Sequence, residues 1–313
     1  MGTARIVIPE FMDLRAVALL QAGHEVLYAP NLVDDTSRLL AEAAQADALI
    51  VRNRTQVRGA LLAALLPRCK VIGRLGVGLD NIDIDGCAAA GMAVIPATGA
   101  NAQSVAEYVI ASAMLLLRGA YASTGAVAQG KWPRTALSNG REIGGKTLGL
   151  VGFGSIGQLT AGLARALGMA VIAHDPMLAP DHPAFVTTGV TPTPLEALLA
   201  AADVVSLHVP LVDATRGLFS SERLAAMKPG SVLINTARGG IVDEPALAQA
   251  LRSGHLGGAA IDVFDREPLP ASAHFDGCPN LLLTPHVAGV TAEANQRVSF
   301  MIAERVAQAL AAA

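Results

Sequence analysis

Cysteine and aromatic residues are scarce in this chain of 313 residues. The three cysteines, Cys69, Cys87 and Cys278, are odd in number and widely scattered. That pattern predicts neither a disulfide framework nor a metal site. It favours a reducing compartment, so we expect a cytoplasmic protein without a bound metal. Aromatic residues contribute only 4%, whereas alanine and glycine are abundant, which suits helices packed closely on a sheet.

Charge and long hydrophobic runs are also limited. Charged residues make up 16% of the chain, the formal net charge is −3, and no basic cluster occurs, which argues against nucleic acid or an anionic membrane as a partner. No uninterrupted run of about 18 apolar residues is present, and residues 1–10 lack the pattern of a signal peptide. Hydrophobic residues reach 52%, and the length predicts two domains.

The most informative stretch spans residues 148–175. An apolar run is followed by three glycines in the G-x-G-x-x-G spacing, then by apolar residues at helical spacing and a second apolar run. This is the dinucleotide-binding fingerprint in its full β-α-β context. The residues that we expect to hold the cofactor here are Gly152, Gly154, Ser155, Ile156, Gly157 and Asp175.

Each part of this motif has a physical reason. Gly152 allows the tight turn after the strand, Gly154 lets the backbone approach a pyrophosphate, and Gly157 lets the helix lie close to the sheet. The helix N-terminus offers free N–H groups and partial positive charge to the phosphates. Asp175 would accept hydrogen bonds from the ribose hydroxyls and repel a 2′-phosphate, so the sequence predicts NAD rather than NADP.

Strands alternate with helices on both sides of this motif, which predicts an α/β protein with two parallel sheets. A flavodoxin-like sheet is expected from strands at residues 5–8, 25–28, 48–51, 71–74 and 93–95. Further strands of the nucleotide-binding sheet are expected at residues 204–208, 231–235, 259–263 and 281–283. A helix over residues 101–117 would lead into the second domain, and one over residues 292–310 would return to the first.

We therefore predict a discontinuous substrate domain, residues 1–100 and 287–313, and an NAD-binding Rossmann domain, residues 101–286. Residues 118–140 lose helical periodicity and contain the only tryptophan, Trp132. Two interpretations remain open for this segment: a projecting arm that contacts a partner, or a packed surface loop.

Three polar residues follow three successive strands of the second sheet: Arg238, Glu267 and His286. Each alone could be structural, but the ends of parallel strands meet at one edge of a sheet, where ligands bind. An arginine suits the carboxylate of a 2-hydroxy acid, a histidine suits its hydroxyl proton, and a carboxylate beside the imidazole fixes the tautomer. His208 also follows a strand, beside Pro210, and a structural role near the cofactor is expected for it.

The first sheet offers its own polar strand ends. Arg52, Asn53 and Arg54 follow one expected strand, and a glycine-rich loop with Val77 and Gly78 follows the next. Ligands bind beyond such ends, so these residues are candidates for contact with the substrate.

Taken together, these motifs resemble the D-isomer-specific 2-hydroxyacid dehydrogenases over essentially the whole chain. The matching motifs are residues 76–83 (GVGLDNID), 101–107 (NAQSVAE), 152–157 (GFGSIG), 208–211 (HVPL), 235–239 (NTARG), 262–264 (DVF) with 267–268 (EP), and 284–289 (TPHVAG).

The resemblance implies an oxidoreductase in which Arg238 orients the substrate, His286 is the acid/base and Glu267 is its partner. The backbone around Val77 and Gly78 would help to hold the substrate carboxylate in a cleft between the domains. A homodimer is implied, with the segment after the long helix contributing to the interface. Beyond the glycine motif, the cofactor contacts that it implies are His208, Pro210, Thr215, Thr236, Ala237, Asp262 and Gly289.

Within the family, the chain looks most similar to 3-phosphoglycerate dehydrogenases, in which the positions of Arg52, Asn53, Asn101 and Asn295 contact the anionic tail. The chain ends at Ala313, so no C-terminal serine-sensing domain is expected. Together, Arg52 and Arg54 would suit phosphate, sulfonate or carboxylate.

Three alternatives remain. Residues 10–13 and 52–57 also look like sulfolactate dehydrogenases, and a hydroxypyruvate or glyoxylate reductase is a further alternative. An NAD-sensing, corepressor-like binding protein is a remote alternative, because the chain lacks extra interaction tails.

Overall fold

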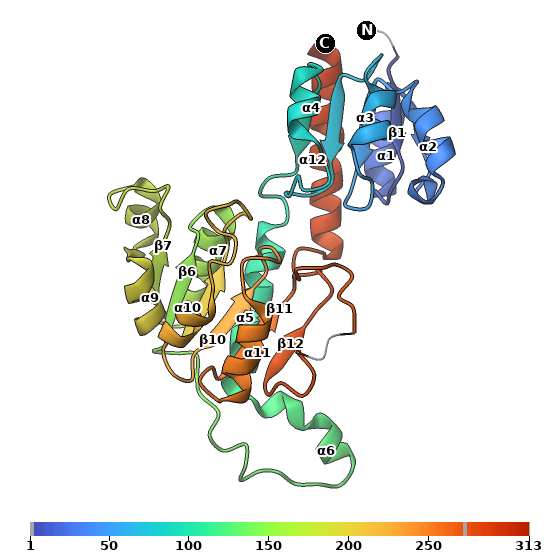
Figure 1. Cartoon of the computed structure of the whole chain (residues 1–313). Helices are drawn as coiled ribbons and strands as arrows, with labels where there is room; N and C mark the ends of the chain where they lie inside the picture. Colours follow the sequence, from blue (N-terminus) through green and yellow to red (C-terminus); the bar gives the residue numbers. More distant parts are fainter. Residues whose placement is uncertain (1–2, 272–273, 313) are drawn as a thin grey trace. The chain divides into compact units, whose positions relative to one another are not determined.

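A computed structural model describes residues 3–271 and 274–312 of the chain (Figure 1). The chain forms two compact units. Unit 1 comprises Met1–Asn101 and Val290–Ala313, and unit 2 comprises Ala102–Gly289.

Unit 1 is built on a five-stranded parallel sheet in the order β2-β1-β3-β4-β5, which is the flavodoxin-like order. Its strands are β1 (Arg5–Ile8), β2 (Glu25–Tyr28), β3 (Ala48–Val51), β4 (Val71–Arg74) and β5 (Ala93–Pro96). Its helices are α1 (Leu14–Gln21), the 3-10 turn η1 (Leu32–Asp34), α2 (Thr36–Ala43), α3 (Gly59–Leu65), α4 (Ile84–Ala89) and α12 (Ala292–Ala312). One core lies between the sheet and α1 with α12, and another lies between the sheet and α2, α3 and α4.

Local sequence explains where these helices begin and how closely one of them packs. Asp13, Asp35 and Asp83 each accept a backbone N–H at the start of α1, α2 and α4. Gly73 lies under α12, where a Cβ would come within 2.8 Å of Ile302 and Val306. The last helix therefore rests directly on β4, at a strand position without a side chain.

Unit 2 is built on a seven-stranded parallel sheet in the order β12-β11-β10-β9-β6-β7-β8. Its strands are β6 (Thr147–Val151), β7 (Ala170–His174), β8 (Thr191–Pro192), β9 (Val204–Leu207), β10 (Val232–Asn235), β11 (Gly258–Ile261) and β12 (Leu281–Leu283). Its principal helices are α5 (Ala102–Arg118), α7 (Ser155–Ala166), α8 (Pro183–Thr188), α9 (Leu195–Ala201), α10 (Ser221–Ala226) and α11 (Glu244–Arg252).

The two faces of this sheet carry different helices. Residues of α5, α7 and α8 share one core with the sheet, and residues of α9, α10 and α11 share the other. The strand order reverses between β6 and β9, which is the switch point where ligands bind in a doubly wound sheet. The predicted fold class, with one flavodoxin-like and one Rossmann sheet, is confirmed.

The segment after α5 has little core packing. It forms the 3-10 turn η2 (Ala120–Ser123) and α6 (Thr124–Ala128), and it extends away from the sheet of unit 2 (Figure 1). Trp132 is 78% exposed and Tyr121 is 63% exposed. These exposed aromatic side chains favour the projecting arm over the packed loop.

In the described part of the chain, no single helix is long and apolar enough to span a membrane. Only α5 taken together with residues 120–128 has the length and composition of a membrane span, and these two described segments are bent by 67° relative to one another.

Candidate active site

The glycine turn after β6 leads tightly into the open N-terminus of α7. Gly152 has φ +95°, and a Cβ there would lie 2.6 Å from the His208 carbonyl oxygen. A Cβ on Gly157 would lie 2.6 Å from the Gly152 carbonyl oxygen, so the first turn of α7 packs directly on the loop. Gly154, the N-cap of α7, faces open space, and no side chain caps the helix. Its first N–H groups are therefore available to an anion.

Asp175 follows β7 and lies beside this turn. Its Oδ2 accepts the Phe153 N–H at 2.9 Å, and its Oδ1 accepts the Met177 N–H at 3.0 Å. Both bonds fix the carboxylate at the edge of the glycine loop. Its position therefore fits the ribose-binding role that the sequence predicts.

The loop after β9 forms the other side of the switch point. The His208 N–H donates to the Val151 carbonyl oxygen at 2.7 Å, and its Nε2 lies 3.0 Å from Ser206 Oγ. Burial lowers the pKa of the His208 imidazole to about 4, so the ring is neutral at physiological pH. Thr215 closes the loop by donating its hydroxyl to the Pro210 carbonyl oxygen at 2.5 Å.

The turn after β10 presents Arg238. The Asn235 side chain holds this turn: its Oδ1 accepts the Ala237 N–H at 3.0 Å, and its Nδ2 donates to the Arg238 carbonyl oxygen at 3.0 Å. Thr236 lies between them. The Arg238 guanidinium donates from Nη1 to the Ala237 carbonyl oxygen at 2.6 Å, so the side chain folds back over its own turn.

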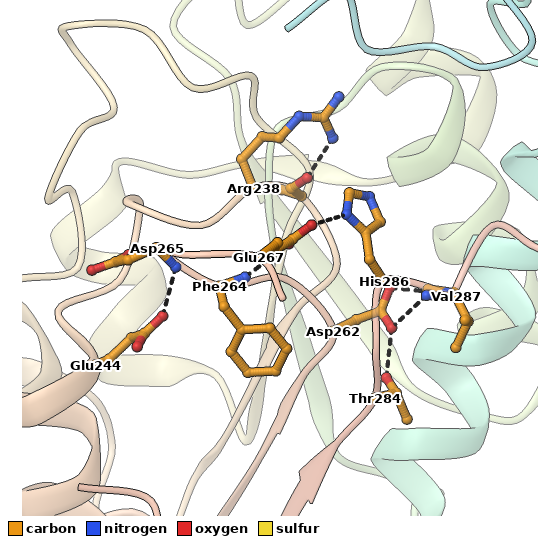
Figure 2. A network of polar contacts seen from close by, with 11 residues as sticks. Arg238, Glu244, Asp262, Phe264, Asp265, Glu267, Thr284, His286 and Val287 are labelled. Atoms are coloured by element: carbon orange, nitrogen blue, oxygen red, sulfur yellow. Dashed lines mark hydrogen bonds and ion pairs between the residues drawn. The ribbon is translucent and has the colours of Figure 1, made fainter. Parts of the chain in front are cut away.

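His286 and Glu267 form the central pair of the site (Figure 2). His286 Nδ1 lies 2.8 Å from Glu267 Oε2, and Glu267 Oε1 accepts the Phe264 N–H at 3.0 Å. The carboxylate accepts only, so Nδ1 carries the proton and Nε2 is the nitrogen left for chemistry. The structure thus brings two of the three predicted catalytic residues into direct contact, and Arg238 extends from the neighbouring turn (Figure 2).

Asp262 holds the turn that carries His286. Its Oδ1 accepts the Val287 N–H and the Thr284 hydroxyl at 2.9 and 2.6 Å, and its Oδ2 accepts the Ala288 N–H at 2.9 Å. His286 itself has φ +55°, a backbone conformation that few residues other than glycine adopt. Asp262 is 1% exposed, so its buried carboxylate stabilises this turn; Gly289 follows it. The family resemblance implies Asp262 as a cofactor contact, and in the structure its carboxylate binds the backbone of this turn.

A second buried carboxylate, which sequence reasoning missed, fixes the loop before Glu267. Glu244 begins α11; its Oε1 accepts the Asp265 N–H at 2.8 Å, and its Oε2 lies 3.1 Å from His274 Nε2. Asp265 Oδ1 accepts the Gly240 N–H at 2.6 Å, and a Cβ on Gly239 would overlap the Phe264 carbonyl. The loops of Arg238 and Glu267 are therefore locked together. The one sequence feature that could have indicated this role of Glu244 is its place beside Asp243 in an acidic pair at the start of a helix.

The predicted substrate-tail residues belong to unit 1, whereas the catalytic network belongs to unit 2. Arg52 follows β3 and donates from Nη2 to Asn295 Oδ1 on α12 at 2.7 Å; its guanidinium lies 5.7 Å from the Phe11 ring centre. The Arg54 guanidinium is ion-paired with Asp34. Asn53 is exposed in the same loop.

The remaining predicted contacts flank the ends of β4 and α5. Val77 is 38% exposed in the loop after β4, next to Gly78, and the Arg74 guanidinium lies over Gly76. Asn101 directly precedes α5. Among the described residues, no group of three or more His, Cys, Asp or Glu side chains could hold a metal ion.

Comparisons with known proteins identify the family of this chain. Residues 110–288 match the protein-family model described as "D-isomer specific 2-hydroxyacid dehydrogenase, NAD binding domain". The chain is 54% identical to a curated (S)-sulfolactate dehydrogenase from Chromohalobacter salexigens, with 97% of this chain and 98% of the relative aligned. The chain belongs to the D-isomer-specific 2-hydroxyacid dehydrogenase family.

Two further relatives of this dehydrogenase bear on length and fold. The D-3-phosphoglycerate dehydrogenase of Mycobacterium leprae is 43% identical over 98% of this chain, which spans only 57% of that protein. The solved structure of TT0316 protein from Thermus thermophilus superposes on this chain with a TM-score of 0.88 at 33% sequence identity. The superposition covers 98% of this chain and 97% of the Thermus chain.

Family membership confirms the predicted reaction class and cofactor. The chain is an NAD-dependent 2-hydroxyacid dehydrogenase. The open space at Gly154, the uncapped start of α7 and the fixed carboxylate of Asp175 fit NAD. When bound, NAD exchanges a hydride with the 2-carbon of the substrate.

Proposed function

We propose that this dehydrogenase interconverts 3-sulfolactate and 3-sulfopyruvate. The observation that carries the proposal is the Arg52–Asn295 pair, because a guanidinium fixed beyond a parallel strand suits a second anionic group on the substrate. The end-to-end similarity to the (S)-sulfolactate dehydrogenase favours a sulfonate as that group. The sequence motifs alone favour 3-phosphoglycerate, but the D-3-phosphoglycerate dehydrogenase from M. leprae has lower identity to this chain and is longer.

In this proposal, unit 2 is the NAD-binding domain and unit 1 the substrate domain. Unit 2 holds NAD through the glycine loop, Asp175 and the strand-end loops that contain His208 and Thr236. The Arg238 guanidinium binds the substrate carboxylate, assisted by backbone N–H groups around Val77 and Gly78. The sulfonate is bound by residues of unit 1: Arg52, Asn53, Asn101 and Asn295.

His286 moves the proton. In reduction, the 2-carbon gains a hydride while His286 Nε2 gives its proton to the carbonyl oxygen, which becomes the hydroxyl. Glu267 stabilises the cationic imidazole that gives the proton and keeps Nδ1 protonated throughout. In oxidation, Nε2 takes the hydroxyl proton as the hydride leaves. The neutral His208 ring cannot serve as this acid, because burial disfavours its protonated form.

The substrate is tested by initial rates of NADH oxidation with 3-sulfopyruvate, 3-phosphohydroxypyruvate, oxaloacetate, hydroxypyruvate and pyruvate. We expect kcat/KM for 3-sulfopyruvate to exceed that for pyruvate at least about 100-fold, because about 2.7 kcal/mol corresponds to one charge-assisted contact. Arg52→Gln should remove this advantage and leave pyruvate reduction nearly unchanged. Arg54→Gln is the matched control with a smaller effect, since Asp34 already binds Arg54. Equal rates with 3-sulfopyruvate and pyruvate would contradict the proposal.

We also propose that the chain acts as a homodimer and that residues 118–140 form part of the interface. The support is the exposure of Tyr121 and Trp132 on a segment that extends from unit 2. Sedimentation equilibrium should give twice the chain mass. Trp132→Ala combined with Tyr121→Ala should weaken the dimer at least about tenfold. A wild-type mass of one chain at micromolar concentration would overturn this proposal.

A further inference from the structure

Glu10 is a buried carboxylate directly beneath the Arg52 loop. It follows β1 and is only 3% exposed. Its Oε2 accepts the N–H groups of Arg52 at 2.8 Å and Thr55 at 3.1 Å. Its Oε1 accepts those of Asn53 at 3.2 Å and Arg54 at 3.0 Å. Four successive backbone donors therefore converge on one side-chain carboxylate.

Four converging N–H groups form the kind of nest that would otherwise bind an anion. In this chain the anion that they bind is the side-chain carboxylate of Glu10. Burial alone would raise the pKa of Glu10, but the hydrogen bonds donated by Arg54, Arg52 and Thr55 outweigh it and leave the pKa below its usual value. Glu10 is therefore ionised at neutral pH, and its donors are not available to a ligand.

Two cationic and two anionic side chains lie at the loop of residues 52–55. Arg52 and Arg54 supply two cations, while Glu10 and Asp34 supply two carboxylates. Asp34 pairs directly with Arg54, whereas the nearest interactions of the Arg52 guanidinium are with neutral groups, Asn295 and Phe11. Among the described residues of this loop, a ligand thus meets the Arg52 guanidinium, and the ionised Glu10 carboxylate interacts electrostatically with the same guanidinium.

We propose that Glu10 selects against a doubly charged tail and so makes Arg52 a site for singly charged groups. The inference rests on the proposed function, because it assumes that Arg52 binds the substrate tail. A phosphate monoester carries a charge of about −1.5 to −2 at pH 7, with a second ionisation near pH 6. A sulfonate keeps one negative charge across this range. The second charge of the phosphate is repelled by Glu10 in a partly buried environment where screening is weak.

The first test uses the wild-type enzyme. The ratio of kcat/KM for 3-sulfopyruvate to kcat/KM for 3-phosphohydroxypyruvate is measured from pH 5.5 to pH 8. We expect the ratio to fall at least about fivefold as the pH is lowered through the second ionisation of the phosphate near pH 6, because the phosphate then becomes singly charged. His286 affects both substrates alike and cancels in the ratio. A ratio independent of pH would overturn the inference.

The second test removes the charge of Glu10. Glu10→Gln preserves the side-chain size and one acceptor oxygen, and we expect it to lower the same ratio at pH 8 at least about tenfold and to flatten its pH dependence. If Glu10 only stabilised the loop, Glu10→Gln would lower kcat/KM equally for both substrates and leave the ratio unchanged. The matched control is Asp47→Asn, because Asp47 lies at the opposite end of β3 and accepts the Arg5 N–H at 2.7 Å. This control should not alter the ratio.

Failure of the proposed function gives a different result. If wild-type enzyme does not reduce 3-sulfopyruvate, the substrate proposal fails, but the charge selection is still measurable. The probes are then 3-sulfolactate and 3-phosphoglycerate, used as competitive inhibitors with whichever keto acid is reduced. Stronger inhibition by 3-sulfolactate at pH 8, with the difference lost in Glu10→Gln, would support the inference. Equal inhibition by both compounds at pH 8 would refute it.

Discussion

Replacing His286 by asparagine is expected to lower kcat for keto-acid reduction at least about 100-fold, with little change in KM. The reason is that general acid catalysis by a positioned side chain contributes about 10²- to 10⁴-fold, and Nε2 of His286 is the nitrogen available for it. Asparagine is preferred to alanine because His286 has φ +55°, and asparagine tolerates this conformation better than most residues. Steady-state rates of NADH oxidation measure the effect.

The loss must come from chemistry rather than from a displaced turn. Asp262 binds the backbone N–H groups of Val287 and Ala288 and the hydroxyl of Thr284, so the turn keeps its anchors when the imidazole is removed. An unchanged dissociation constant for NADH would show that the nucleotide site is intact. Turnover within threefold of wild type would exclude His286 as the acid.

The variant Glu267→Gln tests the assignment of His286 as the acid by changing its partner and leaving the imidazole in place. Glutamine retains an oxygen for the Phe264 N–H but loses the negative charge beside the imidazole. Without that charge the proton donor loses its charged partner, so kcat for reduction should fall, by less than in His286→Asn, with little change in KM. Wild-type kcat in Glu267→Gln would show that Glu267 only orients the ring.

Much of the fold was predictable because local sequence imposes it. Gly152 and Gly157 are required by a positive φ and by contacts of 2.6 Å, so their spacing carries structural information without reference to the rest of the chain. Strands such as β3 and β11 are fully buried and therefore appear as continuous apolar runs. Strand ends were less exact: β9 ends at Leu207 rather than at 208, and β11 ends at Ile261 rather than at 263.

The site was predictable only where the strand-end rule applied. It placed Arg238, Glu267 and His286 at one edge of a sheet, because each residue follows a parallel strand. It gave no information about Asn235, Glu244 or the turn-holding role of Asp262, since these carboxylates and amides act on backbone groups that the strand pattern does not mark. Glu244, for example, binds the N–H of Asp265, 21 residues later.

The same limit affected the cationic loop of unit 1. Arg52 and Arg54 look equivalent in sequence, but the Asp34 side chain binds only the second of them. Likewise, Glu10 gave no sign of its contacts with the loop 42 residues away. Charge balance at a site therefore depends on long-range packing, and a count of nearby arginines overestimates the positive charge that a ligand meets.

Replacing Arg238 by alanine is expected to lower kcat/KM for the keto acid about 1000-fold. A guanidinium binds a carboxylate through two parallel hydrogen bonds, and charge-assisted bonds of this kind are about twice as strong as neutral ones. Arg238→Lys should recover only part of the loss, because an ammonium group cannot reproduce the planar fork. Asn235 holds the turn through backbone atoms of Ala237 and Arg238, so both variants should retain the loop.

The control for Arg238 is Arg223→Ala, in the same unit, where the arginine lies 3.7 Å from Glu196 at the surface. That variant should keep wild-type kcat/KM, since an exposed ion pair contributes little to stability. NADH binding should be unchanged in all three variants because none removes a residue of the glycine loop. Loss of turnover with full NADH binding would assign Arg238 to the substrate, whereas weakened NADH binding in Arg238→Ala would place its guanidinium in the cofactor site instead.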